Sequence, residues 1–330
     1  MIITKTPYRL SLFGGGTDYN AWFENRGGRV LAAAMTHYCY ISVRVLPPFF
    51  EHKYRVAYSK VEQTTDVSGI LHPSVRGCLQ MMEVGEGVEI HHDGDLPAQS
   101  GIGSSSAFTV GLLHALHALK SQMISAKALA SQAIHVEQVV LGEAVGIQDQ
   151  IMASYGGLRI IEMGPQNNWS VRHLPLPSEY LRLFEQHILM GFSGVRRFSN
   201  GYAQKNIEKI RENKNGQELE GISHLAEMAI DAFAANVDFK VIGDLLHQSW
   251  QLKRRLADGT TDNWMDTLYS TAVNAGAFGG KLMGAGGGGF FYFLAPPFRH
   301  DAIKKSLPNV KVWVPFTLDH GGSKVVFFDH

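Results

Sequence analysis

The sequence is poor in cysteine and carries no excess charge of either sign. Its 330 residues include two cysteines, Cys39 and Cys78, which form no Cys-x-x-Cys pair and show no metal-ligand spacing. This excludes a disulfide scaffold and a cysteine-based zinc site, and it predicts a reduced, cytoplasmic setting. The 30 Lys and Arg residues balance the 30 Asp and Glu residues. The charge therefore predicts no attraction to nucleic acid or to an anionic membrane.

Long hydrophobic runs are also absent. The longest apolar stretch, residues 289–298, is too short to cross a bilayer and contains prolines. Lys5 and Pro7 interrupt the first apolar residues, so we expect no signal peptide. We therefore expect no membrane partner, and we make no prediction of oligomeric state.

Two well-known phosphate-binding motifs are missing as well. A Walker loop needs Ser or Thr after its Gly-Lys pair, but Gly280-Lys281 is followed by leucine. A dinucleotide fingerprint needs a third glycine, where Ser106 stands, and an acidic residue about 20 positions further on. No acidic residue occurs between Gly103 and Glu137.

What the chain does contain is a glycine-serine turn at residues 97–107, followed by an apolar pattern that predicts a buried helix. A helix start has backbone N–H groups without intrahelical partners and a partial positive charge, which together suit phosphate oxygens. Taken alone, such a turn favours an ordinary capped helix. The residues expected to hold phosphate are Gly101, Gly103, Ser104, Ser105 and Ser106.

Two further glycine-rich segments change this interpretation. Residues 7–19 read Pro-Tyr-Arg-Leu-Ser-Leu-Phe-Gly-Gly-Gly-Thr-Asp-Tyr, and residues 280–290 read Gly-Lys-Leu-Met-Gly-Ala-Gly-Gly-Gly-Gly-Phe. With the central turn they form an ordered triple that extends over almost the whole chain. The triple resembles the three motifs of the galactokinase, homoserine kinase, mevalonate kinase and phosphomevalonate kinase superfamily, the GHMP kinases. The resemblance implies a kinase that uses ATP and Mg²⁺.

The order of the elements predicts an α+β fold. Strand-like patterns dominate residues 1–60 and helical patterns dominate the chain after residue 195, without regular alternation. The resemblance implies an N-terminal domain like domain 2 of ribosomal protein S5 and a ferredoxin-like C-terminal domain, with the site between them. We place these domains at residues 1–192 and 193–330.

Hydrophobic periodicity and turn residues predict the individual elements. Strands are expected at residues 1–6, 9–13, 29–34, 38–46, 54–58, 88–92, 158–163, 169–173, 188–192, 290–294, 310–315 and 323–328. Helices are expected at residues 104–120, 125–141, 146–154, 198–213, 217–236, 240–258 and 263–275.

Two carboxylates, Glu137 and Asp149, occupy positions that are unusual for charged side chains in a hydrophobic core. Glu137 falls on the same apolar helix stripe as Ile134 and Leu141. A carboxylate on a buried face needs a partner, which is either a structural ion pair or a functional group, unless the helix is rotated to expose it. Asp149 follows 12 positions later, within Gly-Ile-Gln-Asp-Gln. Glu143 lies between them beside a glycine, and we expect it to be solvated.

The resemblance assigns roles to these residues. Galactokinases carry a similar glutamate and a Gly-Ile-Met-Asp-Gln segment, which supply a magnesium ligand and the proposed base. These correspond here to Glu137 and Asp149. The resemblance also gives Ser105 as a second magnesium ligand and Arg9 as the cation that keeps the base ionised. Ser106 stands where the superfamily usually has alanine, and its role is open.

The first motif bears on the acceptor. Galactokinases have Gly-Glu-His-Thr-Asp where residues 14–18 read Gly-Gly-Gly-Thr-Asp, so Gly15 and Gly16 leave room unless a shifted loop fills it. Thr17 and Asp18 are retained, and the carboxylate can accept hydrogen bonds from sugar hydroxyls. The pattern is similar to that of D-glycero-D-manno-heptose 7-phosphate kinases and related fucokinases. It implies phosphorylation of the anomeric C1 hydroxyl of a heptose 7-phosphate to the 1,7-bisphosphate.

A second phosphate on the acceptor would need cations. We place it at Arg196 and Arg197, which follow a Phe-Ser-Gly turn at the expected domain junction, because a guanidinium fork matches phosphate oxygens. Gly286 and Gly287 of the third motif are expected to contact the substrates. Residues 253–255, Lys-Arg-Arg, are expected to form a solvated helix face.

Other functions stay open at this point. A fucokinase-like or galactokinase-like sugar 1-kinase would share these motifs. A non-catalytic ATP and sugar sensor of the same fold would keep the ATP loop but need not keep the base. The presence of Arg9, Glu137 and Asp149 together favours an enzyme. A mevalonate or homoserine kinase would need no Gly-Thr-Asp-Tyr contact with a sugar.

Overall fold

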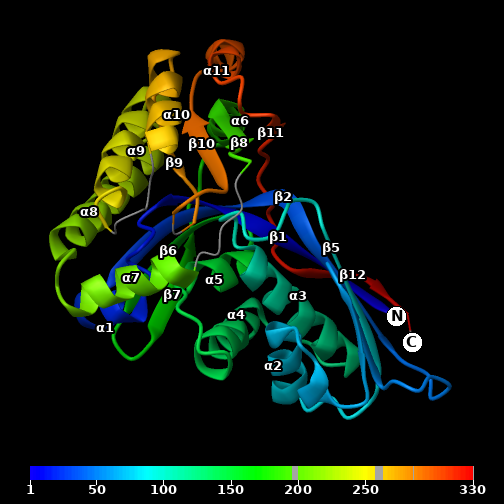
Figure 1. The fold of residues 1–330 in the computed structure, drawn as a ribbon. Helices are drawn as coiled ribbons and strands as arrows, with labels where there is room; N and C mark the ends of the chain where they lie inside the picture. Colours follow the sequence, from blue (N-terminus) through cyan, green and yellow to red (C-terminus); the bar gives the residue numbers. More distant parts are fainter. Residues whose placement is uncertain (195–199, 257–262, 285, 330) are drawn as a thin grey trace.

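Two sheets and the helices around them make up the fold, as a computed structural model shows (Figure 1). The structure describes residues 1–194, 200–256, 263–284 and 286–329. Helices cover both faces of the larger sheet, so the arrangement is the predicted α+β fold. No helix among these described residues is long and apolar enough to cross a membrane.

The larger sheet has eight strands in the order β12-β1-β2-β5-β3-β4, with β6 paired to the other half of β2 and β7 paired to β6. Its strands are β1 (Ile2–Phe13), β2 (Gly28–Val45), β3 (Tyr54–Ala57), β4 (Val61–Thr64), β5 (Val88–Gly94), β6 (Leu158–Gly164), β7 (Asn168–His173) and β12 (Lys324–Phe328). Strand β12 pairs antiparallel with the first residues of β1, so the two ends of the chain meet at one edge of this sheet.

Strands β1 and β2 are each continuous, although the sequence predicted a break in both. The interruption at Pro7 is a register shift between Pro7 and Tyr8, not the end of a strand. Proline lacks an N–H donor, and such an irregularity is where a strand tolerates it. The long β1–β2 pair is the part of the sheet on which the helices α3 and α5, described below, pack.

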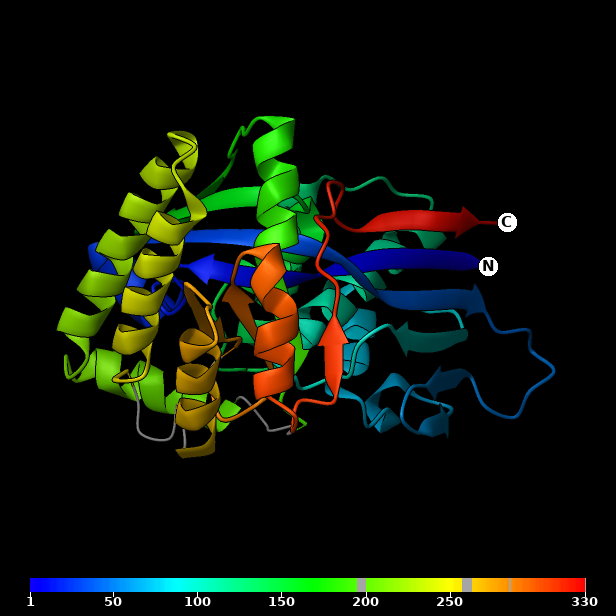
Figure 2. The same ribbon diagram turned by 90° about the horizontal axis from the view of Figure 1, so that it is seen from above.

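The helices are distributed over the two faces of this sheet. Helices α3 (Ser104–Leu119) and α5 (Gln148–Tyr155) pack on β1 and β2, and α8 (Gly216–Ala234) contacts the same two strands. Figure 2 shows the later helices laid across the strands on the opposite side from α3. The remaining helices are α1 (Asn20–Arg26), α2 (Pro73–Met81), α4 (Ala126–His135), α6 (Ser178–His187), α7 (Asn200–Arg211), α9 (Phe239–Lys253), α10 (Asn263–Asn274) and α11 (His300–Ser306), with short turns η1 (Val67–Gly69), η2 (Val136–Val140) and η3 (Pro297–Arg299).

The smaller sheet has the order β11-β8-β10-β9, formed by β8 (Ile188–Phe192), β9 (Gly279–Leu282), β10 (Phe290–Leu294) and β11 (Val312–Val314). If the four strands are numbered 1 to 4 along the chain, their order in the sheet is 4-1-3-2. All neighbouring pairs are antiparallel. With α7 to α10 after β8 and α11 after β10, this is the predicted ferredoxin-like layout.

The sequence of strand β10 is an uninterrupted apolar run because both of its faces are buried. Tyr292 and Phe290 face the main core, which extends down to β1, whereas Phe291 and Phe293 face a second cluster under α10 and α11. A strand that is buried on both faces shows no alternation of polar residues. The small sheet is thereby fixed to the large one through the hydroxyl of Tyr292, which donates to the carbonyl oxygen of Ser11 (3.2 Å).

The elements absent from the sequence prediction are short. They are α1, α2, α6, α11, β4 and β9, each of ten residues or fewer. Helix α2 does carry a recognisable start, because Pro73 is its first residue and the His72 ring accepts from the Val75 N–H. Sheet membership also differs from the predicted domain limits: residues 188–192 pair in the smaller sheet, and residues 324–328 pair in the larger one.

Candidate active site

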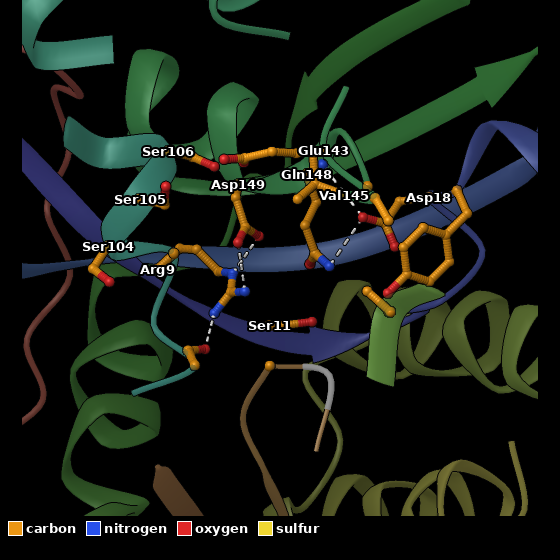
Figure 3. Close-up of a pocket in the computed structure, with 18 of the residues that line it drawn as sticks. Arg9, Ser11, Asp18, Ser104, Ser105, Ser106, Glu143, Val145, Gln148 and Asp149 are labelled. Atoms are coloured by element: carbon orange, nitrogen blue, oxygen red, sulfur yellow. Dashed lines mark hydrogen bonds and ion pairs between the residues drawn. The ribbon is translucent and has the colours of Figure 1, made fainter. Parts of the chain in front are cut away.

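The three glycine-rich segments meet at one cavity of about 490 Å³. It is closed on one side by α3 and α5 and on the other by the end of α9 and the loop after β9 (Figure 3). The residues used below that line it are Arg9, Gly15, Gly16, Asp18, Gly101, Gly103, Ser104, Ser105, Ser106, Glu143, Gln148, Asp149, Lys253 and Gly284.

The turn before α3 is built for close approach of another group to the backbone. Gly101 (φ +81°) and Gly103 (φ +75°) are left-handed, and no side chain caps the first N–H groups of the helix. A Cβ on Gly101 would lie 2.7 Å from the carbonyl oxygen of Met283, and one on Gly284 would lie 2.7 Å from the Gly101 Cα. The second and third motifs therefore touch backbone to backbone, and the free N–H groups face the cavity.

Arg9 and Asp149 form a bidentate ion pair at the centre of the site. Arg9 Nε donates to Oδ1 (2.7 Å) and Nη2 to Oδ2 (2.8 Å), while Nη1 donates to the carbonyl oxygen of Gly101. The Arg9 side chain is 6% exposed and that of Asp149 is 24% exposed. The pair uses two of the lone-pair positions of the carboxylate and leaves others directed at the cavity.

Gly103 makes room for this pair. A Cβ at that position would lie 3.2 Å from Asp149 Oδ2 and 3.3 Å from Arg9 Cγ. The sequence predicted that Arg9 and Asp149 act together, and they are in contact, although 140 residues separate them in the chain.

Figure 3 divides the cavity into two sides, with the Arg9–Asp149 pair between them. We call the part formed by Gly101, Gly103, Ser104, Ser105 and Ser106 the serine side. We call the part formed by Gly15, Gly16, Asp18 and Gln148 the Asp18 side.

Behind the serine side lies Glu137, which is fully buried as its place on the apolar stripe predicted. Its Oε2 accepts from the Ser106 hydroxyl (2.9 Å) and from the Gln150 amide, while Oε1 has no hydrogen-bond partner. Burial raises the pKa of Glu137 to about 7, against the opposing effect of these two hydrogen bonds. A buried carboxylate oxygen without a partner is a place where a cation can bind.

Two details of this region differ from the sequence prediction. Glu137 lies in the π-helical turn η2, not in a continued α-helix, because α4 ends at His135. π-helical turns are frequent at functional sites. In addition, Ser105 and Ser106 both line the cavity, but the serine that donates to Glu137 is Ser106. The residue whose role was open therefore positions the glutamate.

The first turn of α5 connects the parts of the site. Gln148 donates to Asp18 Oδ2 (3.2 Å), Asp149 pairs with Arg9, and Gln150 donates to Glu137. Three consecutive residues thus hold three different charged groups. The sequence predicted a role for Asp149 but none for Gln148 or Gln150, although the amide–acid–amide alternation is visible in the sequence.

Asp18 is 3% exposed and its carboxylate is held from two directions. Oδ1 accepts from the Gly16 N–H (2.9 Å), and Oδ2 accepts from Gln148. Burial raises the pKa of Asp18, which the hydrogen bond from Gly16 opposes. Gly146 is essential to this arrangement, because a Cβ there would lie 1.9 Å from Asp18 Oδ2.

Thr17 does not line the cavity, so the structure gives its predicted role in substrate binding no support. The side chain is fully buried, and its hydroxyl donates to the carbonyl oxygens of Gly14 (2.8 Å) and Arg29 (3.2 Å). It fixes the glycine turn in place, as a hydroxyl in a tight turn commonly does. Gly15 and Gly16 line the cavity, but the room expected beside them is filled. A Cβ on Gly15 would lie 3.0 Å from Ser11 Oγ, and one on Gly16 would lie 3.2 Å from Leu219 Cδ2.

The third motif reaches the cavity through Gly284, not through the two glycines that we predicted. Gly286 and Gly287 are buried, and a Cβ on Gly287 would lie 2.6 Å from the Tyr202 ring on α7. They allow the loop to pack under that helix. The predicted phosphate ligands Arg196 and Arg197 lie outside the described residues.

Lys253 contradicts the expectation of a solvated helix face. The side chain is half-buried and lines the cavity, and Nζ donates to the carbonyl oxygens of Leu282 (2.9 Å) and Gly284 (2.6 Å). Burial, together with the nearby Arg9 guanidinium, lowers the pKa of Lys253 to about 7 against the opposing effect of the Asp18 carboxylate. Arg254, by contrast, pairs with Asp266 (2.7 Å).

Glu143 also lies at the cavity, where the sequence predicted a solvated side chain. It is half-buried, and burial raises its pKa. Among the described residues, no group of three or more His, Cys, Asp and Glu side chains is placed to hold a metal ion. A metal here would have to share its ligands with a bound phosphate.

Comparison with known proteins gives the family. The model of the GHMP kinases N terminal domain matches residues 73–157, which include the serine side, Glu137 and Asp149. The GHMP kinases C terminal model matches residues 229–311, which include Lys253 and the third motif. The two matches together cover about half of the chain.

Individual relatives agree with this assignment. The chain is 27% identical over 326 residues to D-glycero-alpha-D-manno-heptose 7-phosphate kinase of Campylobacter jejuni, covering 95% of each. It is 27% identical over 244 residues to mevalonate kinase of Thermococcus sibiricus, covering 71% of this chain and 68% of that protein.

A similar fold has been solved in a D-glycero-D-manno-heptose 1-phosphate kinase from Bacteriodes thetaiotaomicron, with a TM-score of 0.81, 21% identity and full coverage of both chains. The two domain models match in chain order and meet at one cavity that carries the three motifs. The chain therefore belongs to the GHMP kinase family of ATP-dependent phosphotransferases.

Proposed function

We propose that this GHMP kinase is a sugar 1-kinase that transfers the γ-phosphoryl group of ATP to the anomeric C1 hydroxyl of a sugar phosphate. The proposed acceptor is D-glycero-D-manno-heptose 7-phosphate, and the product is the 1,7-bisphosphate. One observation carries the proposal: the Arg9–Asp149 pair lies between a phosphate-binding helix start and a buried aspartate beside two glycines.

The serine side suits the phosphates of ATP. The uncapped N–H groups at the start of α3 and the hydroxyls of Ser104 and Ser105 face the cavity from one turn. Phosphoryl transfer needs positioning and charge neutralisation more than covalent help, and both are provided by fixed backbone dipoles.

The residues present also fit Mg²⁺. Glu137 offers an oxygen without a hydrogen-bond partner, and the serine hydroxyls lie on the adjacent helix. Mg²⁺ prefers one or two carboxylates together with phosphate oxygens and water. We assign Glu137 and Ser105 as its ligands, with Ser106 holding the glutamate. When bound, the ion would neutralise charge on the phosphates.

Asp149 is the proposed base. The acceptor oxygen attacks the γ-phosphorus, the bond to the β–γ bridging oxygen breaks, and ADP leaves while the hydroxyl proton passes to the carboxylate of Asp149. Arg9 holds this carboxylate through both oxygens, so its orientation is set before the acceptor arrives. Gln148, the neighbour of Asp149 in the chain, donates to Asp18 and orients its carboxylate to accept from a second hydroxyl of the acceptor.

The relatives are named for different acceptors, so the identity of the acceptor depends on the residues of the Asp18 side. The matched proteins include a kinase named for heptose 7-phosphate and another named for mevalonate. The acceptor proposal is supported by the 27% identity, over 95% of each chain, to the heptose 7-phosphate kinase. The space beside Gly15 and Gly16 is filled by Ser11 and Leu219 and gives no argument for a larger sugar. The predicted contact of Arg196 and Arg197 with the distal phosphate stays a prediction.

An acceptor screen tests the proposal. The protein is incubated with ATP, Mg²⁺ and one of heptose 7-phosphate, the unphosphorylated heptose, fucose, galactose, mevalonate or homoserine, and ADP release is measured. We expect the highest kcat/KM for heptose 7-phosphate and a product whose new phosphate is acid-labile, as a glycosyl phosphate is. A higher kcat/KM for any other acceptor, or an acid-stable product, would contradict the proposal.

A further inference from the structure

The cavity contains a cation that the proposed chemistry has not used. Lys253 is the last residue of α9, and its Nζ donates to the carbonyl oxygens of Leu282 and Gly284. An ammonium group carries three N–H donors, so one remains for a ligand. The two carbonyl contacts fix the direction of that third donor.

Among the described residues, no carboxylate forms an ion pair with Lys253, although the charge of Asp18 acts on it. Two lining residues among those described carry a Lys or Arg side chain, Arg9 and Lys253, and only Arg9 forms an ion pair. Another ammonium nearby, that of Lys281, is buried outside the cavity and donates to the carbonyl oxygen of Leu12. A half-buried, unpaired cation is costly unless an anion binds beside it.

The position of Lys253 indicates which ligand brings that anion. Its charge interacts with Arg9, which lies between the two sides of the cavity, and with Asp18. One turn further on, Leu256 lies beside Gly16, where a Cβ would come within 3.6 Å of the leucine Cδ1. In Figure 3 the three serines lie across the Arg9–Asp149 pair from Asp18. An acceptor beside Asp18 and Gly16 would therefore also face the end of α9, where Lys253 and Leu256 line the cavity.

We propose that the ammonium group of Lys253 binds the anionic group of the acceptor, a phosphate monoester remote from the reacting hydroxyl, and so selects phosphorylated over unphosphorylated sugars. The inference rests on the proposed function, because it assumes a sugar phosphate as acceptor. The carbonyl oxygens of Leu282 and Gly284 hold the ammonium, so the third motif contributes to recognition through its backbone.

The test is Lys253→Met, which keeps the length of the side chain and removes the charge. The matched control is Arg255→Met, which removes a charge two residues later from a side chain that is 61% exposed. A hydrogen bond to a charged group contributes about 1.5–3 kcal/mol, which corresponds to roughly a 10- to 100-fold change in binding. We expect KM for heptose 7-phosphate to rise by about that factor in Lys253→Met.

Three measurements separate this role from the alternatives. KM for ATP and kcat/KM for the unphosphorylated heptose should change less than about threefold in Lys253→Met, and Arg255→Met should match the wild type throughout. If KM for ATP rises as much, Lys253 binds the nucleotide and the inference is wrong. If kcat/KM falls equally for both sugars, its role is structural, and the inference is again wrong. A thermal melt confirms that the variant is folded.

The wild-type screen keeps this result separate from the proposed function. If the wild type does not turn over heptose 7-phosphate, the proposed function fails before the variant is made. If it does, the ratio of kcat/KM for the phosphorylated and unphosphorylated sugars decides the role of Lys253 alone. A ratio unchanged in Lys253→Met overturns the inference and leaves the kinase assignment intact.

Discussion

The two sides of the cavity are assembled in different ways. The serine side comes from one continuous segment, in which a glycine turn runs directly into α3. The Asp18 side combines the turn after β1 with the first turn of α5, and the end of α9 closes it. A site from one segment depends on local backbone geometry, whereas a site from several segments depends on the packing of the whole domain pair.

The same difference appears in how the charged groups are held. Glu137 accepts from a hydroxyl and an amide and keeps one oxygen without a partner, so its charge is poorly compensated. Asp149 receives two hydrogen bonds from a guanidinium. In our proposal a bound cation completes the first arrangement, whereas the second is complete before any ligand binds. The following predictions test this contrast, from the largest effect to the smallest.

Asp149→Asn should lower kcat by about 10²- to 10⁴-fold, the usual effect of losing a general base. The amide keeps the shape but cannot take the proton, so KM for both substrates should change little. Steady-state kinetics with varied ATP and acceptor provide the measurement. Near-normal turnover would mean that positioning suffices and that Asp149 only binds the sugar.

Glu137 should make the metal-free protein less stable as the pH rises. Its pKa is raised from 4.5 to about 7 in the fold, so the folded state keeps a proton that the unfolded state releases. The free energy of unfolding should therefore fall between these pH values, by up to about 3 kcal/mol, and level off above pH 7. Urea unfolding in EDTA at several pH values should show this fall relative to Glu137→Gln. Parallel curves for the two proteins would contradict it.

The same variant should raise the Mg²⁺ concentration needed for half-maximal activity by about tenfold or more. An amide oxygen replaces a carboxylate oxygen, and Mg²⁺ favours the charged ligand. Activity is measured against Mg²⁺ at saturating ATP, with Glu143→Gln as a comparison at the same cavity. An unchanged requirement would leave Glu137 as a structural residue held by Ser106 and Gln150.

Gly101→Ala should weaken ATP binding and destabilise the protein by about 1–3 kcal/mol. The substitution strains a left-handed residue and places a Cβ 2.7 Å from the Met283 carbonyl oxygen. Gly142→Ala is the matched control, because Gly142 is also left-handed (φ +64°) and has no atom within 4 Å of that position. Equal losses in both variants would mean that backbone strain, and not the contact between the two loops, sets the effect.

Thr17→Val should cost about 1–2 kcal/mol of stability and leave KM for the acceptor unchanged. The loss follows from two buried carbonyl oxygens that no longer receive the hydroxyl. Thermal melts and steady-state kinetics give the two values. A raised KM without a loss of stability would mean that Thr17 binds the substrate.

The contrast between the two sides also explains what could be predicted from the sequence. The helix after the central turn, the burial of Glu137 and the α+β class follow from local patterns, and the structure agrees with them. The contact between Arg9 and Asp149 needed the family resemblance, because no local rule joins residues so far apart. Short helices such as α6 have too few turns for periodicity to stand out.

Lys253 shows why the remainder could not be predicted. A Lys-Arg-Arg run at the end of a helix has the composition of a solvated surface, and both arginines do pair with carboxylates outside the cavity. Only the packing of α9 against the loop after β9 brings the first of the three into the cavity. The information lies in a tertiary contact between segments separated by about 30 residues.

The pairing of β12 with β1 has a consequence for how the chain folds during synthesis. Residues 2–5 emerge from the ribosome early, but the strand that covers them, residues 324–328, is made more than 300 residues later. Until then, β1 presents an open row of N–H and C=O groups, the kind of edge at which unrelated chains pair. Shortened products that end before β12 should therefore leave that edge open and aggregate more readily than the full chain.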